Sequence, residues 1–91
     1  MEIDGFISRD PNEHAPRMAV GRWGKVVRNR EAFWVRLDSV SKECVIATVD
    51  NQLVLNDLRC GQRLKLSKDL IHITVGEPER RAFVRGVEAQ L

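Results

Sequence analysis

Phe33-Trp34-Val35-Arg36-Leu37 is the first of four short runs, between Ala32 and Val75, that decide the fold. The others are Cys44-Val45-Ile46-Ala47-Thr48-Val49, Arg63-Leu64-Lys65-Leu66 and Leu70-Ile71-His72-Ile73-Thr74-Val75. Each run is rich in apolar or β-branched residues and bounded by polar turns, a pattern typical of antiparallel strands. We predict a mainly β fold, a small, partly open antiparallel β-barrel of SH3-like type with a C-terminal α-helix.

Alternation along the first run predicts which side chains face the core. Phe33, Val35 and Leu37 share one face, whereas Trp34 and Arg36 share the other. The second run carries apolar side chains on both faces, which favours a central strand. The apolar face of the first run therefore packs inward, and Trp34 is predicted on the outer face.

The last run also alternates, and its inward positions are predicted to be Ile71, Ile73 and Val75. His72 and Thr74 are predicted to face outward. The apolar triplet Leu53-Val54-Leu55 lies between two turn signals, Asp50-Asn51 and Cys60-Gly61. We predict it to be an edge segment that is open to strand addition.

The chain is predicted to form one domain with three parts, because 91 residues bury only one modest core. Residues 1–17 form a partly flexible N-terminal arm, rich in prolines and polar residues. Residues 18–75 form the barrel, whose first strand bends where Gly21 and Gly24 bracket Trp23. Residues 77–90 form the C-terminal helix.

The helix prediction rests on Phe83, Val87 and Leu91, which recur every four positions. Acidic residues and a proline precede this stripe, as is typical of a helix start. We expect the stripe to pack on the sheet. The alternative is that it serves as the seam of a homodimer.

Cysteine usage and the chain ends indicate the compartment. Cys44 and Cys60 form no Cys-x-x-Cys motif, and a disulfide between them is the minor alternative to two reduced thiols. The N-terminus lacks the features of a signal peptide, and no apolar run approaches the ~20 residues of a membrane span. We therefore expect a cytoplasmic protein without a membrane association, a cofactor or a metal.

The central unit resembles the YegJ-like family of bacterial and phage domains of unknown function. The resemblance rests on Phe33 through Leu37, on Val49-Asp50-Asn51-Gln52-Leu53-Val54, and on Leu58 through Leu66 with His72-Ile73. Gln52 and Gln62 stand where the family commonly has aspartate. The match covers residues 32–75, about half the chain. It implies the β fold but no catalytic residue.

Basic and aromatic residues gather between positions 17 and 36, although the formal net charge is only +2. Residues 14–30 contain no acid at all. The candidate binding residues are Arg17, Arg22, Trp23, Lys25, Arg28, Arg30, Trp34 and Arg36. A positive groove with aromatic platforms is the usual means of holding single-stranded nucleic acid. Buried tryptophans beside solvated arginines are the simpler structural explanation.

Three classes of function follow from these residues. A binding module that contacts a protein partner ranks first, because tryptophan with arginine commonly anchors such interfaces. Nucleic-acid binding ranks second, because the overall charge is far from strongly basic. Catalysis ranks last, since His14 and His72 have no nucleophile at a recognisable spacing and no phosphate loop occurs. We predict a non-enzymatic protein.

Overall fold

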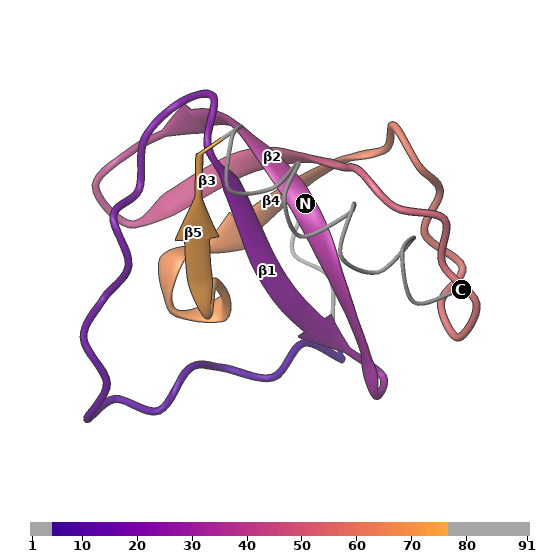
Figure 1. Cartoon of the computed structure of the whole chain (residues 1–91), viewed down its shortest axis with the longest axis horizontal. Coiled ribbons are helices and arrows are strands. Elements are labelled where there is room, and N and C mark those ends of the chain that lie inside the picture. Colours follow the sequence, from indigo (N-terminus) through magenta and orange to yellow (C-terminus); the bar gives the residue numbers. More distant parts are fainter. Residues whose placement is uncertain (1–4, 77–91) are drawn as a thin grey trace.

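The computed structural model describes residues 5–76, which form one five-stranded antiparallel sheet (Figure 1). The strands are β1 (Trp23–Arg28), β2 (Glu31–Val40), β3 (Cys44–Val49), β4 (Arg63–Ser67) and β5 (Ile73–Val75). A short 3-10 helix, η1 (Lys68–Leu70), separates β4 from β5. The prediction of a mainly β fold is confirmed. The expected C-terminal helix lies outside the described residues.

The strand order is β4-β3-β2-β1-β5. The first four strands follow one another as hairpins, and β5 returns to pair with β1 on its other side. Figure 1 shows β3 and β4 passing behind β1 and β2 at a steep angle. Within residues 5–76 no ladder joins β4 to β5, so the sheet is open and has these two strands as its edges.

The concave side of the bent sheet holds the core. Its fully buried members are Val26, Phe33, Val35, Leu37, Val45, Ala47, Val49, Leu58, Leu64, Leu66 and Ile71. Nearly all of them alternate along the strands, as the period of a pleated strand requires. β3 lies between β2 and β4, so its prediction as a central strand is confirmed. Phe33 and Leu37 face inward as predicted.

The β1–β2 hairpin turns at Asn29 and Arg30, which have φ values of 51° and 70°. Positive φ at both central residues defines a type I′ turn, whose twist matches that of the two strands it joins. The N-terminal segment continues the sheet beside this turn. Phe6 forms a bridge with Arg28, and the N–H of Ile7 donates to the carbonyl of Val27 at 2.9 Å. This contact leaves β1 paired on both sides.

Gly24 is the second residue of β1 and is buried, rather than marking a bend in the strand. A Cβ atom placed on it would lie 2.9 Å from Cγ2 of Ile71. The glycine therefore allows the segment after η1 to pack closely over β1. The bend expected here falls earlier, at Gly21, whose φ is +87°.

The inward prediction for the last run is wrong for Ile73, which is 43% exposed, and for Val75, which lies opposite Trp23. Ile71 is buried against Gly24, but β5 begins only at Ile73 and pairs Thr74 with Gly24. Because Gly24 belongs to the core side of β1, Thr74 takes the core-side position in β5. The turn through η1 and His72 thus shifts the alternation by one residue.

Candidate functional site

The outer face of the sheet carries a row of polar and aromatic side chains that crosses four strands. The strand register places Trp23 opposite Arg36, Arg36 opposite Thr48, and Thr48 opposite Arg63. Directly opposite residues on one face lie within contact distance of each other. Sequence alternation placed Trp34 and Arg36 on this outer face, and the register confirms it.

The two tryptophans are half-buried on the outer face of neighbouring strands. Trp34 lies opposite Lys25, while Trp23 is its diagonal neighbour. The indole Nε1 of Trp23 donates to Oδ2 of Asp50 at 2.7 Å. This bond joins β1 to the end of β3 and holds the Trp23 ring over the intervening strand. The tryptophans are therefore held on the surface of the sheet and do not belong to the buried core.

Asp38 offsets part of the positive charge in this row. Its carboxylate lies 3.1 Å from Nε of Arg36 and 3.9 Å from Nε of Arg63, and it accepts a hydrogen bond from the Thr48 hydroxyl. Burial by itself would raise the pKa of Asp38, but the Thr48 hydrogen bond and the Arg36 charge outweigh it and lower the pKa. The ionised carboxylate therefore faces the same surface as the two arginines.

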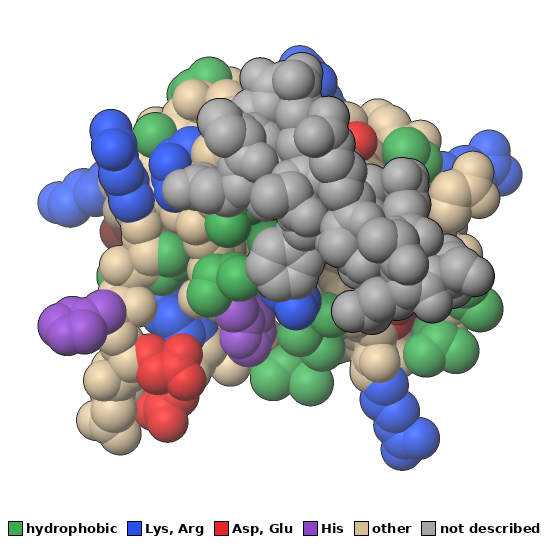
Figure 2. Space-filling view, viewed as in Figure 1, with side chains coloured by type: hydrophobic (Ala, Val, Ile, Leu, Met, Phe, Trp, Pro, Cys, Tyr) green, Lys and Arg blue, Asp and Glu red, His purple; other side chains and the backbone are tan. Residues whose placement is uncertain are grey.

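The other basic candidates do not join this row. Arg22 donates from Nε and Nη2 to the hydroxyl and carbonyl oxygens of Thr74. Arg28 contacts Asn56 and Asp57 at the opposite end of β1, while Arg30 is exposed in the hairpin turn. Arg17 is exposed on the segment before β1. In the visible part of Figure 2, lysines and arginines are spread over separate parts of the surface, with several of them together at the upper left.

A second surface comes from the loop between β3 and β4, which projects at one end of the molecule (Figure 1). The carboxylate of Glu31 accepts the backbone N–H groups of Val54 and Leu55, each at 2.8 Å. The N–H of Val54, above all, holds the pKa of Glu31 below its ordinary value, against the opposing effect of burial. One ionised side chain of β2 thus determines the conformation of the loop.

Asn56 adds a second attachment between this loop and the β1–β2 turn. Its Nδ2 donates to the carbonyl of Arg28 at 2.9 Å and to Glu31 at 3.0 Å. Its Oδ1 accepts from Nη1 of Arg28 and from Nδ2 of Asn29. Both ends of the amide are therefore used, which orients the loop as well as tethering it.

The loop between β3 and β4 (residues 50–62, the pinned loop) leaves some of its apolar side chains outside the core. Val54 is 87% exposed and Leu55 is 60% exposed, whereas Leu58 of the same loop is buried. The prediction that Leu53–Leu55 is an edge segment of the sheet is wrong, because the Glu31 carboxylate takes up the backbone donors of Val54 and Leu55. The sequence did carry a signal for this loop, since Asn51, Asn56 and Asp57 are turn-forming residues around the triplet.

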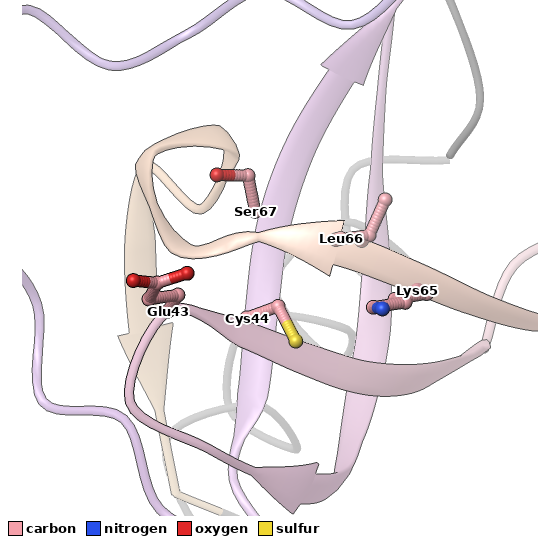
Figure 3. Close-up of a pocket in the computed structure, with 5 residues that line it drawn as sticks. All are labelled: Glu43, Cys44, Lys65, Leu66 and Ser67. Atoms are coloured by element: carbon pink, nitrogen blue, oxygen red, sulfur yellow. The ribbon is translucent and has the colours of Figure 1, made fainter. Parts of the chain in front are cut away.

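A shallow depression of about 180 Å³ lies at the end of β4 (Figure 3). It is lined by Glu43, Cys44, Lys65, Leu66 and Ser67. Cys44 is half-buried, with its sulfur 3.2 Å from the hydroxyl of Ser41, while Cys60 is exposed. Both cysteines are free thiols in the structure, in agreement with the preferred expectation.

The histidines do not form a catalytic cluster with each other. Nε2 of His72 lies 2.8 Å from the carbonyl of Ile7, and His14 is exposed in the N-terminal segment. Between residues 5 and 76, no group of three or more His, Cys, Asp and Glu side chains is placed to hold a metal ion. The same part of the chain contains no helix of the length and apolarity that a bilayer crossing requires.

No protein-family model matches the chain, and no curated protein or solved structure matches it either. The resemblance to the YegJ-like family therefore stays a prediction. Function has to be inferred from the two surfaces themselves, namely the outer face around Trp23 and Trp34 and the pinned loop that carries Val54 and Leu55.

Proposed function

We propose that the protein is a non-enzymatic binding module that inserts Val54 and Leu55 into an apolar groove on a protein partner. The observation that carries this proposal is the contrast between a fixed backbone and exposed apolar side chains. Glu31 holds the two backbone N–H groups at 2.8 Å, yet the side chains are 87% and 60% exposed. Preorganisation of this kind reduces the entropy that a loop loses on binding.

The distribution of charge favours a protein partner over nucleic acid. A phosphate-binding surface needs basic groups along one continuous track. Here the single carboxylate of Asp38 offsets part of the charge of Arg36 and Arg63, while Arg28 ends β1 and Arg22 precedes its other end. The exposed pair in the loop needs no charge, since burial of apolar surface suffices for association.

The order of the strands supports the finer prediction for the fold. A meander of four strands, a 3-10 turn and a fifth strand returning to β1 is the arrangement expected of an SH3-like barrel. Such barrels serve as scaffolds for loops that bind partners, so the fold is compatible with the proposed role. The free thiols Cys44 and Cys60 support a cytoplasmic location.

A comparative pull-down tests the proposal. Immobilised wild-type protein and the double variant Val54→Ser/Leu55→Ser are incubated with cell extract, and captured proteins are identified by mass spectrometry. Val20→Ser is the matched control, because Val20 is 66% exposed but lies in the segment before β1. A partner retained by the wild type and by Val20→Ser, and lost with the double variant, is the expected result.

Two outcomes overturn the proposal. If Trp34→Ala loses the partner while the loop variant retains it, the outer face is the binding surface. If single-stranded DNA or RNA quenches tryptophan fluorescence in a saturable, salt-sensitive manner, the protein binds nucleic acid instead. Both assays need only the purified full chain and its point variants.

A further inference from the structure

The edge strand β4 presents unpaired backbone groups at alternate residues. The N–H of Val49 donates to the carbonyl of Gln62, and the N–H of Lys68 donates to the carbonyl of Glu43. Gln62 and Lys68 therefore both face β3, one at each end of β4. Because backbone groups alternate in direction along an antiparallel strand, Arg63, Lys65 and Ser67 direct their N–H and carbonyl groups away from β3.

No strand occupies that side of β4 in the described part of the chain. The sheet order ends at β4, and within residues 5–76 no other strand pairs with the outward groups of Arg63 and Lys65. The carbonyl of Ser67 belongs to the first turn of η1, because Ser67 is the N-cap of that 3-10 helix. An uncovered edge of this kind is a template for pairing with another strand. Strand addition, expected from the sequence near Leu53–Leu55, is therefore available at β4.

The side chains of β4 determine what kind of strand the edge accepts. Arg63, Lys65 and Ser67 are exposed on the outer face, whereas Leu64 and Leu66 are buried in the core. An added strand would place alternate residues opposite the two bases, where acidic side chains pair favourably. The residues between them would lie alongside the leucines, where apolar side chains extend the core.

A second copy of the chain fits this edge poorly. Two β4 strands related by a two-fold axis would bring Lys65 and Arg63 of one copy against the bases of the other. Like charges directly opposite each other in a sheet are destabilising. Lys65 also lines the depression that β3 and β4 share with Glu43 and Cys44 (Figure 3).

We infer that the β4 edge binds an extended peptide segment of a partner protein in which acidic residues alternate with apolar ones. The segment adds a sixth strand beside β4, through the outward N–H and carbonyl groups of Arg63 and Lys65 and the N–H of Ser67. Its acidic side chains pair with Arg63 and Lys65. This surface is separate from the Val54–Leu55 loop and does not depend on the function proposed for that loop.

Fluorescence anisotropy with a short labelled peptide that alternates valine with glutamate tests this inference. The full-length protein is expected to bind this peptide. The same peptide with lysine in place of glutamate, or with methylated amide nitrogens on the edge that would face β4, should not bind. Proton exchange at the Lys65 amide should slow when the peptide is bound, because that N–H gains a hydrogen-bond partner.

Lys65→Glu should lower the affinity for the peptide about tenfold, since it replaces a favourable cross-strand pair with like charges. Arg17→Glu makes the same change in net charge at an exposed position before β1 and should leave the affinity unchanged. Leu55→Ser should also leave it unchanged, which separates this surface from the pinned loop.

Three results would overturn the inference. One is the absence of peptide binding up to about 1 mM. Another is equal binding of the amide-methylated peptide, which would show that backbone pairing is not involved. The third is concentration-dependent dimerisation of the protein that Lys65→Glu alters, which would make a second copy the occupant of the edge.

Discussion

The carboxylate of Glu31 accepts the backbone N–H of Val54 at 2.8 Å, across 23 positions of sequence. This relationship joins the first residue of β2 to the tip of the loop between β3 and β4. It explains how a loop rich in exposed apolar side chains keeps a defined conformation without packing them into the core. The consequences can be tested in solution.

Glu31→Ala should release the loop. Because the N–H groups of Val54 and Leu55 lose their acceptor, their amide protons should exchange on the order of tenfold faster than in the wild type. Exchange at core amides such as that of Val35 should change far less. Hydrogen exchange followed by NMR measures this directly. Equal acceleration across the sheet would mean that Glu31 supports the whole fold rather than the loop.

The stability should fall as the pH is lowered through the acidic range. The pKa of Glu31 and that of Asp38 both lie below their ordinary values of 4.5 and 3.8. Each group therefore binds protons more weakly in the folded state, stabilises the fold above its unfolded pKa, and loses that contribution as the pH falls through its folded pKa. Urea unfolding between about pH 6 and about pH 2.5 measures the slope. Glu31→Gln and Asp38→Asn should each reduce it, and an unchanged slope in both would contradict the assignment.

Gly24→Ala should destabilise the protein by about 1–3 kcal/mol, because its Cβ would overlap Ile71 in a filled core. The distance from that Cβ to Ile71 Cγ2 would be only 2.9 Å. Chemical denaturation gives the free energy of unfolding. The double variant Gly24→Ala/Ile71→Ala should lose less unfolding free energy than the two single variants together, because truncation of Ile71 removes the clash. Strict additivity would rule out this contact as the cause.

Truncation of two leucines in the same loop should change the stability by very different amounts. Leu58 is only 7% exposed, so Leu58→Ala should cost about 2–5 kcal/mol of unfolding free energy. Leu55 is 60% exposed, so Leu55→Ala should stay within about 0.5 kcal/mol. Thermal and urea unfolding of the two variants makes the comparison. A large loss for Leu55→Ala would show that its side chain stabilises the monomer.

Sequence alternation predicted the strands of the central unit because the core lies on one side of the sheet. Phe33, Val35 and Leu37 could pack inward in only one register, since a shift by one residue would expose all three. The same alternation gave the wrong inward residues for β5. The 3-10 helix and the close approach of Ile71 to Gly24 reset the alternation, and no local pattern records a contact between residues so far apart.

The candidate surface was predicted only in part. Trp34 and Arg36 were placed correctly on the outer face. The eight candidate residues do not form one cluster, since Arg22 precedes β1 and Arg28 lies at its other end. Asp38 was missed as the partner of Arg36 and Arg63. Its importance depends on the bulge in β2 and on the β3–β4 register, which bring the three side chains together.

The amino-acid sequence by itself determined the class of fold, the positions of the central strands and the composition of the core, because alternation and turn residues are local properties. Only the tertiary structure decided which surfaces are available for binding. The capture of Val54 and Leu55 by Glu31, the neutralisation of Arg36 by Asp38 and the open edge of β4 all join residues from different strands. Hydrogen bonds and ion pairs across strands depend on register, which follows from the packing of the whole sheet.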